Sequence, residues 1–453
     1  MSDRLFGTDG IRGAAGEEPL TTPTLTRLGH LLGERLLQDA DNSTPPTVLI
    51  GHDGRESGET LCAALTDGLT AAGAIVEIAG LAPTPTVAYL TATGDFSAGI
   101  VVSASHNPAA DNGIKLLAAD GSKCSEDFEL SLEQDLVSTR KLVAAPQSGE
   151  CRRSKGLLGD YVAWLRNEAF SELDLSGNRI LIDCANGAWS QLCPRLLKAF
   201  GAEAVCINDR PDGSNINLEC GTMYPEAMAA ATRNNGCQLG LSVDGDGDRG
   251  ILADGNGRLL DGDAILAGLG ALMHARGALA NDTVTATVMS NLALEKWCQQ
   301  QGINLHRTPV GDRHVAAAMR EQDLCLGGEK SGHILFGAEH GFRGDGIYTL
   351  LKVLSELSIA GHEIDAFADG YADMPQELRN LKVNERRPLE ELTQLAAADI
   401  EVTADLGNSG RTVVRFSGTE LKLRLMVEAE TTEMVTAALD KLQNAACADG
   451  ILS

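Results

Sequence analysis

Basic residues are scarce in this sequence. Its 453 residues include 37 lysines and arginines against 63 aspartates and glutamates, which gives a formal net charge of -26. Such a charge repels the phosphate backbone of nucleic acids and anionic lipid headgroups, so we expect no nucleic-acid partner and no membrane surface. A phosphorylated substrate would need a locally basic pocket inside this acidic shell.

The chain also lacks the patterns of a disulfide framework and of a membrane protein. Its 11 cysteines are scattered without a CxxC pair, which is typical of reduced thiols. The opening segment MSDRLFGTDGIRG has no apolar signal core, and no apolar run approaches the roughly 18 residues of a membrane span. We therefore expect a soluble, cytoplasmic protein.

Short apolar runs recur along the chain, and each ends in a polar or glycine-containing turn that precedes a helical pattern. Examples are VLIGHDGR, GIVVSASHNP, ILIDCANGAW, LGLSVDGDGD and VTATVMSNLALEK. This order is typical of α/β units, in which ligands bind beyond the carboxyl ends of the strands. The last part instead shows two strand patterns, TVVRF and LKLRLMVE, and a helical pattern over 432–446.

The length and these patterns predict four domains. At about 150 residues per domain, a single compact domain is excluded. We expect three successive α/β mixed-sheet domains plus a smaller α+β C-terminal domain around a central cleft. The predicted bounds are 1–152, 153–254, 255–370 and 371–453.

The first chemical motif is VVSASHNPAADNGIK. Pro108 stops the strand, so Ser105 is expected on a turn at its end, where the hydroxyl could act as a nucleophile. Lys115 could supply positive charge or transfer a proton if the loop folds back. The alternative is that Ser105 and Asn107 only bond to the turn backbone.

The second motif is LGLSVDGDGDRG, in which three aspartates alternate with glycines after an apolar strand. Asp244, Asp246 and Asp248 can turn their carboxylates toward one ion, and without a cation they would repel each other. Mg²⁺ would relieve that repulsion. The alternative is a solvated acidic turn.

Two other interpretations of this segment fail, a calcium-binding EF-hand and a dinucleotide-binding loop, and the chain also lacks the phosphate-binding P-loop motif. An EF-hand beginning at Asp244 needs glycine sixth and glutamate twelfth, but the chain has Arg249 and Gly255 there. The spacing of Gly245, Gly247 and Gly250 matches GxGxxG, yet the aspartates between them would repel a pyrophosphate. No GxxxxGK[ST] loop occurs anywhere in the chain.

The third motif is LGGEKSGHILF. The carboxylate of Glu329 and the hydroxyl of Ser331 suit the vicinal hydroxyls of a sugar, and His333 could exchange protons. A histidine with a purely structural role is the alternative here.

The fourth motif is RFSGTELKLR. An arginine beside hydroxyls and glycine-exposed amides is what a phosphate dianion requires, whereas a surface turn with an incidental arginine is the alternative. The candidate phosphate-binding residues are Arg415, Ser417, Gly418, Thr419 and Arg424.

In this order the four motifs resemble the α-D-phosphohexomutase superfamily, and the resemblance covers essentially the whole chain. The segments FGTDGIRG, VMSNLALEK and VGDRHV are most similar to those of the bacterial phosphoglucosamine mutases, which interconvert glucosamine 6-phosphate and glucosamine 1-phosphate on the route to cell-wall precursors. The family's RPSGTEP and TTGDG segments differ here, where the chain reads RFSGTEL and FRGDG.

The resemblance implies a mechanism and roles for individual residues. Ser105 would be a phosphoserine that also binds Mg²⁺ with the three aspartates, and a sugar 1,6-bisphosphate would be intermediate and activator. Lys115 and His333 would transfer protons, while a hinge before the last domain would close the cleft. Arg12 would be an active-site cation. The implied substrate contacts are Arg249 near the transferring group, Glu329 and Ser331 at the sugar, and the Arg415 segment at the other phosphate.

Three alternatives remain open at this point. The first is a phosphomannomutase or phosphoglucomutase of the same superfamily. The second is a catalytically silent paralogue that binds phosphosugars, and the third is a metal-dependent phosphatase. The sequence does not determine the oligomeric state, and a homodimer is one state consistent with it.

Overall fold

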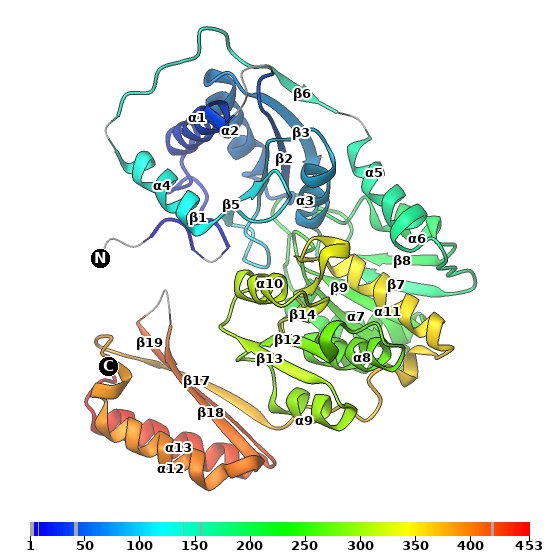
Figure 1. Cartoon of the computed structure of the whole chain (residues 1–453), viewed down its shortest axis with the longest axis vertical. Coiled ribbons are helices and arrows are strands. Elements are labelled where there is room, and N and C mark those ends of the chain that lie inside the picture. The colour runs from blue at the N-terminus through cyan, green and yellow to red at the C-terminus, as the bar shows by residue number, and fades with distance from the viewer. Residues whose placement is uncertain (1–3, 8, 40–43, 139, 155, 418–420) are drawn as a thin grey trace.

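The structure is a computed structural model that describes residues 4–7, 9–39, 44–138, 140–154, 156–417 and 421–453. Four sheets follow one another along the chain (Figure 1). In Figure 1 the last sheet and its two helices, coloured orange to red, lie to one side of the other three. The predicted class, three α/β units with mixed sheets followed by a smaller α+β unit, is confirmed.

The first sheet has the strand order β1-β5-β4-β2-β3-β6. Successive residues of β2 face opposite sides: Ile50 packs with helices α1 and α2, and Leu49 packs with α3, because strand side chains alternate between the two faces. The strands are β1 (Ile11–Ala14), β2 (Thr47–His52), β3 (Ile75–Leu81), β4 (Ala98–Val102), β5 (Asp111–Ala118) and β6 (Cys151–Arg153), and the helices are α1 (Thr22–Asp39), α2 (Gly58–Ala71), α3 (Thr84–Thr93) and α4 (Glu126–Val137).

The second sheet repeats the central part of the first. Strand β7 runs parallel to β8 and β9, and β9 turns back into the antiparallel β10. Its strands are β7 (Arg179–Asp183), β8 (Glu203–Ile207), β9 (Leu239–Val243), β10 (Gly250–Asp254) and β11 (Leu259–Leu260), with α5 (Leu157–Trp164), the π-helix η1 (Leu165–Ala169), α6 (Cys193–Ala199), the 3₁₀ turn η2 (Gly221–Met223) and α7 (Pro225–Asn234).

The third sheet repeats the plan again, with β12 parallel to β13 and β14 and with β14 antiparallel to β15. Its strands are β12 (Thr283–Thr287), β13 (Asn304–Thr308), β14 (Leu326–Gly328), β15 (Ile334–Phe336) and β16 (Arg343–Gly344), with helices α8 (Gly262–Ala275), α9 (Leu292–Gln301), α10 (Asp312–Glu321) and α11 (Gly346–Ala360) and the 3₁₀ turns η3 (Ala280–Asp282), η4 (Ala338–His340) and η5 (Ile364–Ala366).

The second and third units share one hydrophobic core. Leu241 and Val243 of β9 belong to the same buried cluster as Ile347 and Leu351 of α11, and α11 packs against both β9 and β10. Two units with a common core move as one body more readily than two that share only a polar contact.

The C-terminal unit is a three-stranded antiparallel sheet of order β17-β19-β18. Leu423 and Leu425 of β19 pack against Leu439 and Leu442 of α13, as the alternation in LKLRLMVE predicts. The elements are β17 (Gln376–Lys382), η6 (Leu389–Glu391), α12 (Thr393–Leu406), η7 (Gly407–Ser409), β18 (Gly410–Phe416), β19 (Lys422–Ala429) and α13 (Thr432–Ala448).

The domain bounds stay a prediction, and two short strands lie beside them. Strand β6 pairs with β3 and crosses the expected joint between 152 and 153, and β11, beyond the joint at 254, pairs with β10 of the second sheet. Runs of two or three residues show no periodicity that would have revealed them. In the part of the chain that the structure describes, no helix is both long and apolar enough to cross a membrane.

Candidate active site

Ser105 lies in the loop between β4 and β5, buried, with a φ of 54°. Its amide donates to Oγ of Ser103 at 2.8 Å, and its carbonyl accepts from Nη2 of Arg55 at 2.9 Å and from Nδ2 of Asn217 at 2.8 Å. These bonds hold a left-handed conformation that is uncommon for a residue with a Cβ. The Ser105 hydroxyl donates to Oδ2 of Asp244 at 2.5 Å.

Arg55 holds the loop of Ser105 in place through hydrogen bonds to the loop's backbone carbonyls. It is buried, pairs with Asp53 at 2.9 Å, and donates to the carbonyls of Asn107 at 2.9 Å and Asp111 at 3.0 Å. No sequence motif had assigned a role to Arg55. Its position in GHDGR, in a polar turn after β2, was the available signal, because such turns meet at one edge of the sheet.

His106 stands next to the serine hydroxyl, with Nδ1 3.4 Å from Oγ of Ser105. Burial and the charges of Arg249 and Arg12 lower the pKa of His106 to about 4. The imidazole is therefore neutral at neutral pH and leaves the positive charge of the site to arginine and lysine side chains.

The three aspartates lie in the loop between β9 and β10, and all are buried. One carboxylate oxygen from each of Asp244, Asp246 and Asp248 lies within 4.8 Å of the others. Gly245 allows this loop to reach Ser105, since a Cβ there would lie 2.8 Å from the serine's carbonyl oxygen. The structure thus brings together the serine and the aspartates of two motifs that lie 139 residues apart.

Lys115 projects from β5 into the aspartate loop. Its Nζ lies 2.8 Å from Oδ2 of Asp246, 2.9 Å from Oδ2 of Asp248 and 3.2 Å from Oδ2 of Asp9. Burial alone would lower the pKa of Lys115, but these carboxylates raise it well above its usual value. Lys115 is therefore a buried ammonium group at the centre of the site.

The acidic loop suits a divalent cation. Burial and the charges of Asp248 and Asp246 hold the pKa of Asp244 well above its usual range. Burial would do the same to Asp248, but Lys115 and His333 bring its pKa down to about 2. Oδ1 of Asp246 and Oδ1 of Asp248 are buried and have no hydrogen-bond partner among the described residues. Hard carboxylate oxygens with unused lone pairs are what Mg²⁺ binds.

Asp9 is a further site residue that the sequence analysis did not single out. Besides Lys115 it binds Arg12 and, at 2.5 Å, Nζ of Lys123. Burial would raise the pKa of Asp9, but Lys115, Lys123 and Arg12 hold it well below its usual value. Arg12 also donates to Oδ1 of Asn107 at 3.2 Å, next to the serine loop. Asp9 could have been identified from its place in the family-like segment FGTDGIRG.

The predicted sugar-binding motif faces the same region. A cavity of about 410 Å³ is lined by Asp9, Arg12, Arg249, Glu329 and His333. The size is within the range of small-molecule sites. The predicted sugar residues Glu329 and His333 therefore share one cavity with the two predicted site arginines.

Within this motif each side chain has a distinct environment. Glu329 accepts the amide of Gly311 at 3.0 Å. His333 is buried, with Nδ1 3.9 Å from Oδ1 of Asp248 and Nε2 3.7 Å from Oδ2 of Asp312. Ser331 is exposed and lines a second cavity of about 790 Å³. Arg249 lines both cavities.

The predicted phosphate segment lies on the C-terminal sheet. Arg415 of β18 stands opposite Arg424 of β19, and Arg424 is 3.4 Å from Oγ of the buried Ser417. Burial and then the charge of Arg424 lower the pKa of Arg415, as expected for two cations that share one small area. Gly418 and Thr419 lie outside the described residues.

The C-terminal unit is attached to the third unit and not to the serine loop. Arg411 donates to the carbonyl of Ser290 at 2.5 Å, and Glu428 accepts the amide of Leu292 at 2.8 Å. No hydrogen bond or ion pair between described residues connects the C-terminal unit to Ser105. Arg415, Ser417 and Arg424, the described residues of the phosphate segment, therefore make no hydrogen bond or ion pair with the serine.

Comparison with known proteins shows the same plan along the entire chain. Models of the phosphoglucomutase/phosphomannomutase family match residues 3–142 as α/β/α domain I, 160–257 as domain II, 261–374 as domain III and 378–445 as the C-terminal domain.

Relatives and solved structures agree with these matches. A phosphoglucosamine mutase of Koribacter versatilis is 42% identical over 453 residues, with 98% of this chain and 97% of the relative covered, and one of Solibacter usitatus is 41% identical over 96% of both chains. A crystal structure of a phosphoglucomutase/phosphomannomutase family protein from Burkholderia thailandensis has a TM-score of 0.82 at 25% identity, with 98% of this chain and 97% of that chain covered. The chain therefore belongs to the phosphoglucomutase/phosphomannomutase family, among the relatives of the bacterial phosphoglucosamine mutases, and is a phosphosugar mutase.

Proposed function

We propose that this enzyme interconverts glucosamine 6-phosphate and glucosamine 1-phosphate, with Ser105 as the phosphoryl carrier. The observation that carries the proposal is the buried contact of 2.5 Å between the Ser105 hydroxyl and Asp244 in a loop of three aspartates. Full-length relatives at about 40% identity that are named phosphoglucosamine mutases support the choice of sugar.

Asp244, Asp246, Asp248 and an oxygen of phosphorylated Ser105 would hold Mg²⁺. The ion would supply positive charge beside the phosphoryl group that is transferred. Arg12 and Arg249 add positive charge from the neighbouring cavity of about 410 Å³. Together with the ion, these arginines would offset the charge of an anionic substrate in a chain of net charge -26.

The reaction consists of two phosphoryl transfers. In the first, the bond between phosphorus and Oγ of Ser105 breaks and Oγ takes up a proton from an acid. A bond forms between phosphorus and a sugar hydroxyl oxygen, whose proton passes to a base. The resulting bisphosphate turns over and returns its other phosphoryl group to Oγ of Ser105. Because one phosphoryl group leaves Ser105 and the other returns to it, the enzyme is phosphorylated again at the end. A sugar 1,6-bisphosphate would activate an enzyme that has lost its phosphate.

Lys115 and His333 are the proposed proton carriers. They approach Asp248 from two sides, Lys115 at 2.9 Å from Oδ2 and His333 at 3.9 Å from Oδ1. Glu329 and Ser331 would bind the sugar hydroxyls. Arg415, Ser417, Gly418, Thr419 and Arg424 would bind the phosphate that is not transferred, which requires the C-terminal unit to rotate about its junction with the third unit.

A coupled assay tests the choice of sugar. Rates with glucosamine 6-phosphate, mannose 6-phosphate and glucose 1-phosphate are compared at equal concentrations, and kcat/KM is expected to be highest for the glucosamine substrate. A clear preference for either hexose phosphate would replace this proposal with the phosphomannomutase or phosphoglucomutase alternative. Release of inorganic phosphate without isomer exchange would indicate a phosphatase.

Intact-mass analysis tests the carrier. We expect a species heavier by one phosphoryl group, about 80 Da, after incubation with a sugar bisphosphate and Mg²⁺, and its loss in Ser105→Ala. Ser138→Ala, at an exposed serine outside the site, is the control. Absence of the added mass from the wild-type chain would instead indicate a silent phosphosugar-binding protein.

A further inference from the structure

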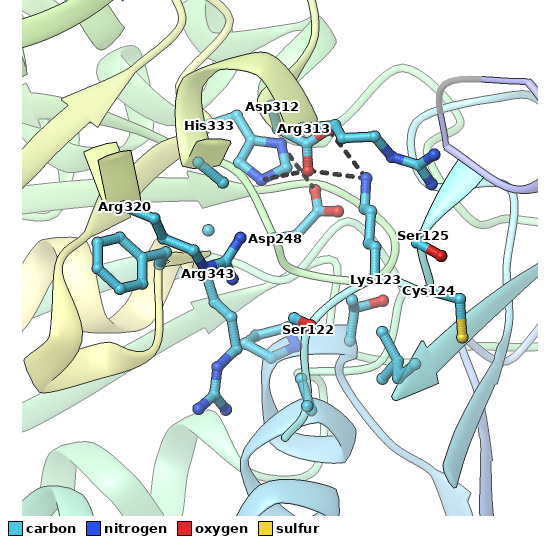
Figure 2. Close-up of a pocket in the computed structure, with 18 residues that line it drawn as sticks. Ser122, Lys123, Cys124, Ser125, Asp248, Asp312, Arg313, Arg320, His333 and Arg343 are labelled. Carbon is cyan, nitrogen blue, oxygen red and sulfur yellow. Dashed lines mark hydrogen bonds and ion pairs between the residues drawn. The ribbon is translucent and has the colours of Figure 1, made fainter. Parts of the chain in front are cut away.

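A smaller cavity of about 150 Å³ lies between the first and third units, separated from the larger substrate cavity by a shared wall of Asp312 and His333. Figure 2 shows Arg320 and Arg343 on the side of this cavity opposite Lys123 and Ser125. None of the proposed catalytic steps uses the two arginines.

Arg343 has unused hydrogen-bonding capacity in this cavity. Its Nε and Nη1 are buried and have no hydrogen-bond partner among the described residues. Its guanidinium group packs against the backbone of Gly341, where a Cβ would overlap it. Buried donors without acceptors are costly and rare, so a ligand or water that supplies acceptors is favoured there.

Arg320 adds a second cation to the same side. Its guanidinium group lies over the ring of Phe342 at 5.0 Å from the centroid. Within the described ranges, neither Arg320 nor Arg343 has a carboxylate within ion-pair distance. The nearby Asp120 instead accepts from the amide of Ser122 at 2.9 Å and from its hydroxyl at 2.6 Å.

The other charged groups around the cavity are already paired. Lys123 binds Asp312 at 2.7 Å, and Arg313 binds Glu129 at 2.9 Å. Asp248, which also lines this cavity, is paired with Lys115. Arg320 and Arg343 are therefore cations at this cavity that have no ion-pair partner among the described residues.

We propose that this cavity is a second anion site, which binds a free oxyanion of the size of phosphate between Arg343 and Arg320. Planar guanidinium groups match the geometry of a tetrahedral oxyanion through paired N–H donors. A cavity of about 150 Å³ holds a molecule of roughly the size of benzene, which admits free phosphate and excludes a hexose phosphate. Ser125, across the cavity, has a hydroxyl that can donate to the same ion.

Isothermal titration of the full chain with inorganic phosphate tests the site. Arg343→Gln should weaken one binding event at least tenfold, since a charge-assisted hydrogen bond is lost. Arg415→Gln, in the proposed substrate site, should keep that event. Arg210→Gln is the matched control, because the Arg210 side chain is 96% exposed and lies outside the cavity. Arg320→Gln serves as a second variant if Arg343→Gln does not fold.

A parallel titration with glucosamine 6-phosphate tests whether the site binds free phosphate or the phosphate group of a sugar phosphate. Its binding should be unchanged in Arg343→Gln, because the cavity is too small for the sugar. A crystal soaked in tungstate should show an anomalous peak between Arg320 and Arg343. The proposal is overturned if wild-type and Arg343→Gln chains bind phosphate equally, if neither binds it, or if tungstate occupies only the substrate cavity.

Discussion

The hydroxyl of Thr84 donates to Oδ2 of Asp246 at 2.5 Å, and the Thr84 amide donates to the Asp246 carbonyl at 2.9 Å. The two residues are 162 positions apart and belong to the first and second units, Thr84 at the start of α3 and Asp246 in the loop between β9 and β10. Because Thr84 and Lys115 both occupy Oδ2, the free oxygen Oδ1 of Asp246 is the one left for a cation.

Thr84→Val should weaken Mg²⁺ binding. The substitution removes the bond that orients Asp246, and the loss of such a supporting contact typically reduces metal affinity or activity by about 10- to 100-fold. The measurement is the Mg²⁺ concentration for half-maximal mutase activity. Thr84→Ser keeps the hydroxyl and should behave like the wild type. Equal Mg²⁺ dependence of Thr84→Val and wild type would show that this contact does not orient the aspartate.

Arg55→Lys should lower kcat more than it raises KM. Lysine keeps the charge beside Asp53, but it cannot donate at once to the carbonyls of Ser105, Asn107 and Asp111. Small misplacement of a reacting group can cost about 100-fold in rate. Initial-rate kinetics measure this, and the mass of the phosphorylated chain reports whether Ser105 still accepts a phosphoryl group. Arg210→Lys, at an exposed arginine, is the control; a change confined to KM would contradict the positioning role.

Glu428→Leu should loosen the junction between the third and C-terminal units. Glu428 is buried and accepts from Leu292 at 2.8 Å, from Arg411 at 2.7 Å and from Gln376 at 2.6 Å. Removing one partner of a buried ion pair costs about 3–5 kcal/mol. Hydrogen exchange at the Leu292 amide measures local opening.

Glu428→Gln is the matched control variant for Glu428→Leu. It keeps an acceptor for Leu292 and should lose about 1 kcal/mol, the usual net value of a hydrogen bond. If both variants leave exchange at the start of α9 unchanged, the Glu428 contacts do not hold the junction.

Asp263→Asn should change how stability depends on pH. Burial raises the pKa of Asp263 to about 6, although Lys330, 3.6 Å away, opposes this shift. A carboxyl whose pKa is higher in the folded state is stabilising while it is protonated and loses that stabilisation as the pH rises from about 4 to about 6. Two pKa units correspond to roughly 3 kcal/mol.

Urea midpoints across this range measure the effect. The stability of the wild type relative to Asp263→Asn should fall between pH 4 and 6 and stay constant above pH 7. Asp160→Asn, at an exposed aspartate, should follow the wild-type profile. Parallel profiles for Asp263→Asn and wild type would contradict the prediction.

The sequence alone predicted the α/β class and the residues of each motif, because both depend on local patterns. Three alternating aspartates after an apolar strand indicate a cation site whatever the rest of the chain does, and strand-end turns indicate where ligands bind. Strand β6 was missed because a run of three residues is too short for a periodic signal. The shared core of the second and third units was also hidden, since α11 packs on strands about 100 positions earlier in the chain.

Only the tertiary structure decided how the motifs meet. Lys115 contacts Asp246 and Asp248 across more than 130 positions. Thr84 and Asp9, two residues without an assigned role, join the site, and Arg55 holds the loop of Ser105. Spacing in a sequence does not encode these contacts, because they depend on which strand ends face each other when the sheets pack. The sequence by itself therefore determined the chemical groups of the site, and the packing of the first two sheets determined that Ser105 faces Asp244.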